Sequence, residues 1–447
     1  MSKKLFGTDG VRGIANTYPL TIEFCTKLAI VLSDTVCLKQ HRVAIARDTR
    51  ISGQMLFSAL CAGFTAKGID VIDLGIIPTP LCTTLTPNLD VDMSIMITAS
   101  HNPYQDNGLK LIDCHGDKFS DSKTNALEEK LEKDIEINCN PEKIGKITTY
   151  GDALSHYLDI ADKIVGSAGL KGMRIALDSA NGSFSGILGP VFQSLGADVI
   201  SLAETPNGFN INAECGSQHT EKLSETVCKQ KCDLGIAVDG DGDRIIICDE
   251  NGKRLDGDQI IAYLAACLQK NKTLKGNTVV ATVYSNLGLG KYIRSLQLDF
   301  QASAVGERYV IDKMREFGAN LGGEESGHMV LSDYSKTGDA LIAALVVARG
   351  ICTDKRKVSE IFPVFEPFPC ASHNLKFADK NTVERILDEP SVKSCIADID
   401  AELEGHGRIL VRKSGTEPVI RLKIEDENAQ LAQKQAEKLL ACINAVS

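Results

Sequence analysis

The stretch MITASHNPYQDNGLKL (96–111) runs from an apolar strand into a polar loop. The run MSIMI (93–97), which overlaps its start, is typical of a strand buried on both faces, and the Asn-Pro pair at 102–103 ends regular structure. Open α/β sheets bind ligands beyond the carboxyl ends of their strands. We therefore expect the hydroxyl of Ser100 at the mouth of a sheet. A Ser-His-Asn turn that satisfies its own backbone is the alternative.

Short β-rich runs alternate with helical patterns along the first three quarters of the chain, which indicates α/β layers. RVAIA from Arg42, MRIALD from Met173 and NTVVATV from Asn277 are expected strands. A helix tail that leads into a strand recurs three times, as GFTAKGIDVIDL (63–74), PVFQSLGADVISL (190–202) and KYIRSLQLDFQAS (291–303). We therefore expect three tandem, related α/β domains.

The proline-rich stretch IFPVFEPFPC (361–370) predicts a linker. After it the pattern changes to a strand, a helix, two strands around a loop and a final helix, which indicates a smaller C-terminal antiparallel α+β domain. The expected domains are 1–150, 151–252, 253–365 and 366–447.

The composition is that of an ordinary soluble protein: 447 residues, 43% hydrophobic residues and a net charge of −10. The acidic balance argues against a nucleic-acid partner, because phosphate-backbone affinity needs a surplus of Lys and Arg. We expect no membrane span, since no segment approaches ~18 apolar residues. The fifteen scattered cysteines form no C-x-x-C pair. They are interpreted as reduced core residues of a cytoplasmic protein.

The segment LGIAVDGDGDRIIICDE (234–250) sets Asp239, Asp241 and Asp243 at alternate positions in a tight loop between two apolar strands. Two unit charges ~4 Å apart repel by about 4 kcal/mol at an effective dielectric of ~20, and a bound divalent cation would relieve this repulsion. Oxygen ligands with room for a phosphate favour Mg²⁺. An EF-hand Ca²⁺ loop matches the acidic spacing when Glu250 is included, but Arg244 stands where glycine is required. A solvated acidic turn is the second alternative.

Two further loops carry groups suited to a phosphosugar. VRKSGTEPVIR (411–421) offers two arginines, two hydroxyls and glycine-flanked amides, the parts of a phosphate cradle, unless it is an ordinary basic turn. GGEESGHMV (322–330) offers carboxylates, a hydroxyl and an imidazole to sugar hydroxyls or phosphate. Arg12 lies between glycines in FGTDGVRG (6–13) and suits an anion. The chain has no Walker A loop, so a nucleotide substrate is not indicated. Phosphoryl transfer on a phosphosugar is the simplest chemistry common to all these parts.

The motifs TASHNP (98–103), DGDGDR (239–244), GEESGH (323–328) and RKSGTEP (412–418) occur in the order and approximate spacing of the α-D-phosphohexomutases, and the chain resembles that family over its whole length. LFGTDGVRG, DNGLK, SNLGLG, VGERYV and RKSGTEPVIR are most similar to the members that act on glucosamine phosphates. The resemblance implies four domains around a central cleft.

The resemblance also implies roles for individual residues. Ser100 would carry the phosphoryl group, and one Mg²⁺ per chain would be held by Ser100, Asp239, Asp241 and Asp243. Glucosamine 6-phosphate and glucosamine 1-phosphate would interconvert through a glucosamine 1,6-bisphosphate, feeding amino-sugar nucleotide synthesis. Residues near the reacting groups would be His101, Lys110, Arg12 and His328, with the general acid and base left open. The remaining substrate-binding residues would be Glu324, Ser326, Arg412, Ser414, Gly415, Thr416 and Arg421.

One position departs from the pattern of the glucosamine members, which commonly carry Gln where this chain has Glu325. A phosphomannomutase or phosphoglucomutase is therefore the near alternative. A metal-dependent sugar phosphatase and a non-catalytic sugar-phosphate sensor are more distant ones. The sequence leaves the oligomeric state open, a homodimer among the options.

Overall fold

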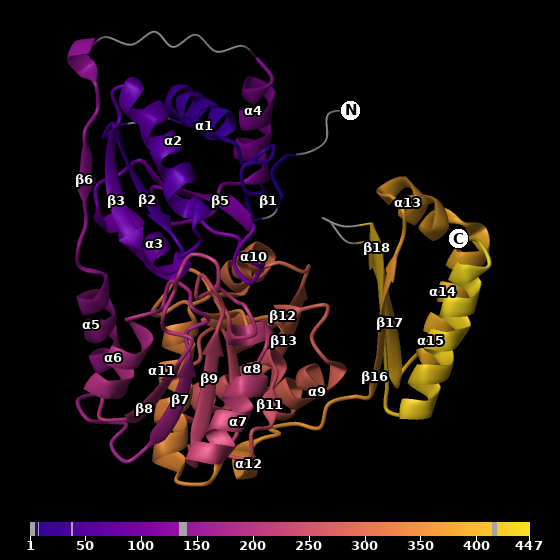
Figure 1. The fold of residues 1–447 in the computed structure, drawn as a ribbon. Coiled ribbons are helices and arrows are strands. Elements are labelled where there is room, and N and C mark those ends of the chain that lie inside the picture. Colours follow the sequence, from indigo (N-terminus) through magenta and orange to yellow (C-terminus); the bar gives the residue numbers. More distant parts are fainter. Residues whose placement is uncertain (1–4, 8, 37–38, 134–140, 414–417) are drawn as a thin grey trace. The chain divides into compact units, whose positions relative to one another are not determined.

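In the computed structural model, three mixed β-sheets, each with its own helices, are followed along the chain by one antiparallel sheet, as the sequence predicts (Figure 1). The structure describes residues 1–447 except 1–4, 8, 37–38, 134–140 and 414–417. It divides into two compact units, one made of 1–283 and 299–364, the other of 284–298 and 365–447. Among the described residues, no helix is long and apolar enough to cross a membrane.

The first sheet has the order β1-β5-β4-β2-β3-β6. β4, β2, β3 and β6 run parallel, whereas β5 is antiparallel to β4 and β1 to β5. All five residues of β4 are buried, as expected for MSIMI. The strands are β1 (Val11–Ile14), β2 (Arg42–Arg47), β3 (Asp70–Ile76), β4 (Met93–Ile97), β5 (Asp106–Asp113) and β6 (Ile147–Thr149), with helices α1 (Ile22–Thr35), α2 (Ser52–Ala66), α3 (Thr79–Leu85) and α4 (Asp121–Leu131).

The second sheet has the order β11-β10-β9-β7-β8, and β10 and β11 are its antiparallel strands. Its strands are β7 (Arg174–Asp178), β8 (Asp198–Leu202), β9 (Leu234–Val238), β10 (Ile245–Cys248) and β11 (Arg254–Leu255), with helices α5 (Ala153–Val165), α6 (Leu188–Ser194) and α7 (Glu221–Gln230).

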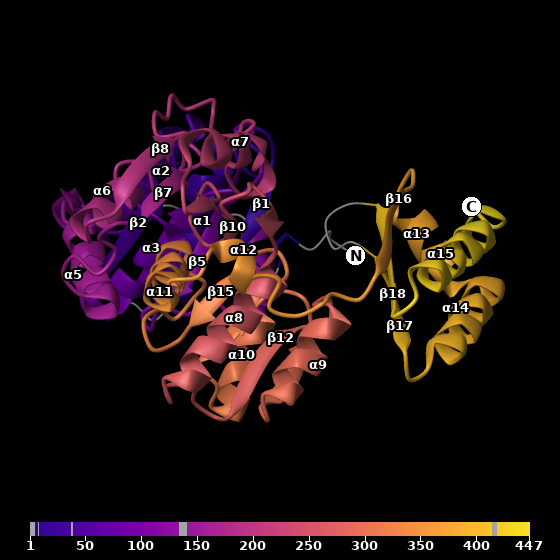
Figure 2. The same ribbon diagram turned by 90° about the horizontal axis from the view of Figure 1, so that it is seen from below.

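The third sheet has the order β13-β12-β14-β15, with β15 antiparallel to β14. Its strands are β12 (Thr278–Thr282), β13 (Asp299–Ser303), β14 (Leu321–Gly323) and β15 (Met329–Leu331). The helices of this part are α8 (Gly257–Lys270), α10 (Glu307–Phe317), α11 (Ala340–Asp354) and α12 (Val358–Ile361), whereas α9 (Leu287–Ser295), between β12 and β13 in sequence, belongs to the second compact unit. A Cβ on Gly322 would meet α10, and one on Gly323 would meet α8. Because successive strand residues face opposite sides, α8 and α10 cover the two faces of this sheet (Figure 2).

The three α/β sheets share one arrangement that positions the functional loops. In each, a buried parallel strand is followed by a loop and then by an antiparallel neighbour, as in β4-β5, β9-β10 and β14-β15. The connection 98–105, which carries Ser100, is called the serine loop, and 239–244, which carries the three aspartates, is called the acidic loop; with the GEESGH turn (323–328) they occupy these equivalent connections. The sheets therefore present the three motifs at the carboxyl ends of parallel strands, where α/β folds bind ligands.

The repeated helix-to-strand junction predicted from the sequence is present at α2-β3, α6-β8 and α9-β13. In each, a residue in the left-handed region ends the helix: Gly68 (φ 75°), Gly196 (φ 89°) and Gln297 (φ 61°). The next amide donates to the carbonyl five residues earlier, which is the 6→1 bond of a Schellman cap. The same local chemistry thus turns each helix back toward its strand.

The second unit contains the three-stranded antiparallel sheet β16-β18-β17 with α13, α14 and α15, whose apolar residues form one core with the sheet (Figures 1 and 2). The elements are β16 (Cys370–Lys376), α13 (Lys380–Asp388), α14 (Pro390–Leu403), β17 (Gly407–Lys413), β18 (Val419–Asp426) and α15 (Ala429–Asn444). The segment 284–298, which carries α9, belongs to this unit: Asn286 Nδ2 donates to Phe368 O at 3.0 Å.

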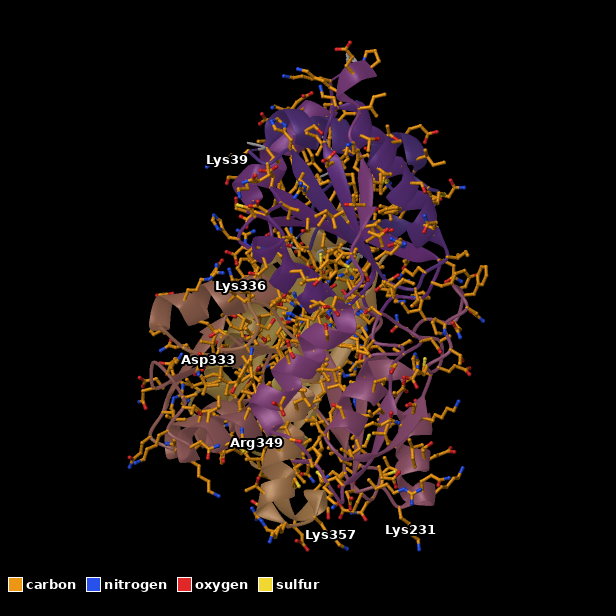
Figure 3. The ribbon with its side chains drawn as sticks, turned by 90° about the vertical axis from the view of Figure 1, so that its left-hand side faces the viewer. Lys39, Lys231, Asp333, Lys336, Arg349 and Lys357 are labelled. Carbon is orange, nitrogen blue, oxygen red and sulfur yellow. The ribbon has the colours of Figure 1, made fainter. Side chains whose placement is uncertain are left out.

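Side chains on the surface of the first unit join its α/β layers. The guanidinium of Arg349, labelled in Figure 3, reaches from α11 and donates to the carbonyl of Ile164 at the end of α5. Lys336, labelled in the same view, donates to the carbonyl of His115 at 2.5 Å and so ties the third layer to the first.

Candidate active site

Ser100 lies directly beyond β4, and its side chain is turned toward the second sheet. The residue is 1% exposed, its φ is 52°, and its amide donates to Thr98 Oγ1 at 2.9 Å. Its Oγ donates to Asp239 Oδ2 at 2.6 Å, across 139 residues of sequence. The hydroxyl therefore does not serve a local turn, which was the alternative interpretation of the motif.

The three aspartates of the acidic loop converge in the interior. Asp239 and Asp241 are fully buried and Asp243 nearly so, and one oxygen from each lies within 4.8 Å of the others. Burial and the charges of its two neighbours hold the pKa of Asp239 well above the usual carboxyl range. In the part of the chain that the structure describes, Asp241 Oδ1 and Asp243 Oδ1 have no hydrogen-bond partner. Crowded carboxylates with unpartnered buried oxygens, next to a serine hydroxyl, fit a hard divalent cation such as Mg²⁺.

The position of the acidic loop between two strands excludes the EF-hand alternative. The loop joins β9 to β10, with Val238 paired to Ile245, instead of joining two helices. The carboxylate of Glu250 is turned away to the amide and hydroxyl of Ser359.

Lys110 brings a positive charge to the aspartates. Its Nζ lies 2.7 Å from Asp241 Oδ2, 3.0 Å from Asp243 Oδ2 and 3.3 Å from Asp9 Oδ2. Burial acts to lower the pKa of Lys110, but these carboxylates outweigh it and hold the pKa well above its usual value. Arg12, on β1, donates to the same Asp9 at 2.6 Å. The lysine and arginine predicted from the sequence thus meet through a shared carboxylate.

His328 connects the acidic loop to the third sheet. Its Nε2 lies 3.5 Å from both Asp243 Oδ2 and Glu307 Oε1, and its Nδ1 lies 3.4 Å from Glu324 Oε2. Burial alone would lower the pKa of His328, but the three carboxylates raise it to about 9. An imidazole with this pKa is protonated at neutral pH, so both of its ring nitrogens carry a hydrogen that can be donated.

His101 has the opposite electrostatic environment. Burial, and then the positive charges of Arg244 and Arg12, lower the pKa of His101 to about 3. The ring is neutral at pH 7, and its Nδ1 lies 3.3 Å from Ser100 Oγ. Arg244 itself keeps a buried Nε that finds no hydrogen-bond partner among the residues described, which is suited to an anion.

Glu324 and Ser326 of the GEESGH turn differ in their exposure to solvent. Glu324 is buried, and its Oε1 accepts the amide of Gly306 at 3.0 Å. Ser326 is exposed in the same turn. The amide of Ile245 donates to Gly327 O at 3.0 Å, so this turn is paired directly with the strand that follows the acidic loop.

Two of the predicted cradle residues, both arginines, are described in the second unit. Arg412 and Arg421 are directly opposite each other on β17 and β18, and among the described residues neither of their buried Nε atoms has a hydrogen-bond partner. The guanidinium of Arg412 lies 4.5 Å from the ring centre of Tyr284. Two adjacent guanidiniums repel unless an anion joins them, which fits a phosphate. Ser414, Gly415 and Thr416 lie outside the described residues.

Comparison with known proteins gives the same order of domains. Models described as phosphoglucomutase/phosphomannomutase alpha/beta/alpha domains I, II and III match residues 3–138, 149–252 and 256–368, and the C-terminal domain model matches 373–441. The phosphoglucosamine mutase of Chelativorans sp. (strain BNC1) is 42% identical over 447 residues, covering 99% of this chain and 98% of that protein. The phosphoglucosamine mutase of Granulibacter bethesdensis is 44% identical over 430 residues, covering 95% and 93%.

The chain belongs to the phosphoglucomutase/phosphomannomutase family. It is an enzyme, a phosphohexomutase of the isomerase class, as the resemblance implied.

Solved structures show how widely the phosphohexomutase fold is shared. A family protein of Burkholderia thailandensis matches with a TM-score of 0.82 at 21% identity, covering 100% of this chain and 98% of that one. The N-acetylphosphoglucosamine mutase of Aspergillus fumigatus, in complex with GlcNAc-6P and magnesium, matches with a TM-score of 0.66 at 16% identity, covering 99% and 96%. At these identities the likeness concerns the fold.

Sequence reasoning missed several residues that this phosphohexomutase places around the site. Asp9 stands beside Arg12 in FGTDGVRG, and Glu307 lies in VGERYV, so both were inside quoted motifs. Lys118, whose Nζ is 2.5 Å from Asp9 Oδ1 and 2.5 Å from Glu307 Oε2, lies in none. Its role becomes visible only when the first and third layers are packed together.

Proposed function

We propose that this phosphohexomutase interconverts glucosamine 6-phosphate and glucosamine 1-phosphate, with Ser100 as phosphoryl carrier and a glucosamine 1,6-bisphosphate as intermediate. The contact that carries the proposal is the 2.6 Å hydrogen bond from Ser100 Oγ to Asp239, within a cluster of three buried aspartates. The full-length relatives named phosphoglucosamine mutase support the substrate.

The chemistry is a pair of phosphoryl transfers. The P–Oγ bond of phosphoserine breaks while a hydroxyl of the sugar forms a new P–O bond and releases its proton, and Ser100 Oγ takes up a proton as it leaves. After the bisphosphate turns around, Ser100 Oγ loses this proton and bonds to the other phosphorus, while the bond from that phosphorus to the sugar oxygen breaks and the sugar oxygen is protonated. Mg²⁺ held by Asp239, Asp241, Asp243 and an oxygen of Ser100 would offset the ~1.5–2 negative charges of the phosphoserine and stabilise the moving phosphoryl group.

The remaining residues would bind the substrate and move the proton. His101 offers a neutral nitrogen 3.3 Å from Ser100 Oγ, whereas Lys110 and His328 are cationic and would donate to phosphate oxygens. Arg412, Arg421 and the loop 414–416 would bind the phosphate that is not reacting, and Glu324 and Ser326 the sugar hydroxyls. Such a cradle must accept both orientations of the bisphosphate, so it should recognise phosphate more than the sugar.

The proposal also includes a cytoplasmic location and a homodimeric assembly. A cytoplasmic protein agrees with the lack of a disulfide among the described cysteines. The homodimer stays a prediction, and so do the domain boundaries 1–150, 151–252, 253–365 and 366–447.

Ser100→Ala tests the proposal. The variant should lose the phosphorylated Ser100 peptide in mass spectrometry and about 10³-fold or more of the isomerase rate, as nucleophile removals do. Ser94→Ala is the control, because Ser94, on β4, is also fully buried and hydrogen-bonded, but to Thr86 in the turn that precedes this strand. Wild-type activity in Ser100→Ala would overturn the proposal. Steady release of inorganic phosphate without any 1-phosphate would indicate the phosphatase instead.

A further inference from the structure

The loop that follows β4 is held by its backbone carbonyls. The carbonyl oxygen of Ser100 accepts hydrogen bonds from Arg50 Nη2 and Asn212 Nδ2, both at 2.9 Å. The carbonyl oxygen of Asn102 accepts from the same two nitrogens, at 2.8 Å and 3.0 Å. Each NH₂ group therefore directs both of its hydrogens to the same pair of carbonyls. We call the side chains of Arg50 and Asn212 the loop clamp.

Arg50 is fixed within the first sheet. β2 and β4 are parallel neighbours, so the segment after β2 lies beside the serine loop. Asp48 Oδ2 accepts from Arg50 Nε at 2.9 Å and from Thr98 Oγ1 at 2.6 Å, and the side chains of the Asp48–Arg50 pair are wholly buried. Thr98 Oγ1 in turn accepts the amide of Ser100. The guanidinium is thus oriented by a carboxylate that also orders the start of the loop.

Asn212 reaches the loop from the second α/β layer. Its backbone is in the left-handed region (φ 57°), its amide donates to Ala180 O at 2.9 Å, and it is 8% exposed. A Cβ on Gly240 would lie 2.8 Å from both Asn212 Nδ2 and the Ser100 carbonyl oxygen. The acidic loop therefore packs directly on the clamp, at a point where a larger residue does not fit.

Ser100 needs such support because its own backbone is unfavourable. A φ of 52° is uncommon for a residue with a β-carbon and persists only where the surroundings fix it. With the peptide oxygen held from both sides, Oγ is directed at Asp239. Phosphoryl transfer is sensitive to this placement, since a shift of ~1 Å in a reacting group can cost about 10²-fold in rate.

We propose that Arg50 and Asn212 are positioning residues for phosphoryl transfer, and that Asn212 couples the serine loop to the domain that carries the acidic loop. The inference rests on the proposed role of Ser100. Neither side chain needs to touch the substrate: the clamp sets where Ser100 Oγ lies relative to Asp239, and hence how often the two reacting groups are aligned.

Two substitutions at Asn212 remove the hydrogen bonds of its side chain without straining its left-handed backbone. Asn212→Asp keeps the shape and tolerates the left-handed backbone, but it turns carboxylate oxygens toward the two carbonyls. Asn212→Gly removes the side chain and also tolerates that backbone. Asn181→Asp is the control, because Asn181 is likewise 8% exposed and left-handed (φ 48°), but its Nδ2 bonds stay within the second layer, to Asn210 O and Cys215 Sγ.

The measurements are kcat and KM for the full chain with Mg²⁺ and hexose 1,6-bisphosphate, the rate of Ser100 phosphorylation followed by intact mass, and the melting temperature. We expect kcat and the phosphorylation rate to fall about 100-fold in Asn212→Asp and about 10-fold in Asn212→Gly, with KM changed less than about threefold. Arg50→Lys should resemble Asn212→Gly, because lysine keeps the charge but lacks the planar fork. Asn181→Asp should keep a wild-type kcat even where its melting temperature falls.

Two results would overturn the proposed positioning role of the clamp. One is a wild-type kcat in both Asn212 variants. The other is a kcat of Asn181→Asp that falls as its melting temperature falls. Ser100→Ala, measured beside them, separates this failure from that of the proposed function. If Ser100→Ala is inactive while the Asn212 variants are normal, the clamp alone is wrong. If Ser100→Ala is active, the proposed function fails and the clamp, which rests on it, fails as well.

Discussion

Removal of the Lys110 ammonium should make the stability of the protein depend strongly on a divalent cation. Nζ lies 2.7 Å from Asp241, 3.0 Å from Asp243 and 3.3 Å from Asp9. At an effective dielectric of ~20, each contact contributes about 5–6 kcal/mol before desolvation is subtracted. Deleting one partner of a buried ion pair costs about 3–5 kcal/mol, because the other charges stay buried. We therefore expect Lys110→Met to melt about 10 °C below wild type in EDTA.

Calorimetry in EDTA and at increasing MgCl₂ measures this effect. A ligand at ~100 times its Kd stabilises the folded state by about 2.7 kcal/mol. The gain should be larger in Lys110→Met, since Mg²⁺ no longer competes with the ammonium. Lys118→Met is the control: Lys118 contacts Asp9 and Glu307, so the variant should lose stability but keep the wild-type response to Mg²⁺. A Lys110→Met protein that melts like wild type in EDTA, or responds to Mg²⁺ no more than wild type, would refute the reasoning.

Three further outcomes are expected. The pKa of His328 is raised to about 9, so the protonated imidazole stabilises the folded state fully below pH ~6.5, and this stabilisation is lost as the pH rises through 9. In EDTA, His328→Gln should therefore melt at a lower temperature than wild type at pH 7. Between pH 7 and 9.5 the melting temperature of this variant should fall less than that of wild type. Arg412→Ala should raise the KM for hexose 6-phosphate about 10-fold or more through loss of a charge-assisted pair, whereas Tyr284→Phe, which keeps the ring under the guanidinium, should leave it unchanged in the same kinetic assay. Gly63→Ala should lower the melting temperature although alanine favours helices by about 1 kcal/mol, because its Cβ would lie 2.6 Å from Ala29 Cβ and overpacking costs about 1–3 kcal/mol; an unchanged or raised melting temperature would contradict this.

Local patterns were enough to predict the elements that carry the site. MSIMI, with its apolar run and following Asn-Pro, became β4, and the alternating aspartates lie between β9 and β10 as expected. The repeated helix-to-strand junctions were visible because each depends on residues adjacent in sequence. These features follow from periodicity, turn chemistry and local capping.

Residues that act through strand order could not be found in the same way. Arg50 reaches the serine loop because β2 happens to be the parallel neighbour of β4, and Asn212 because the second layer packs against the first. Neither stands in a periodic or charged pattern that would single it out. The protonation states of His101 and His328 were equally out of reach, because they depend on which charges surround each ring.

The most direct test of the central claim is a ³¹P NMR time course on the purified protein with Mg²⁺, a trace of hexose 1,6-bisphosphate and equimolar glucosamine, glucose and mannose 6-phosphates. Glucosamine 1-phosphate should appear well ahead of the other two 1-phosphates, and Glu325 would then be a tolerated residue of the sugar loop. Glucose or mannose 1-phosphate appearing first would contradict the proposed substrate while leaving the family intact.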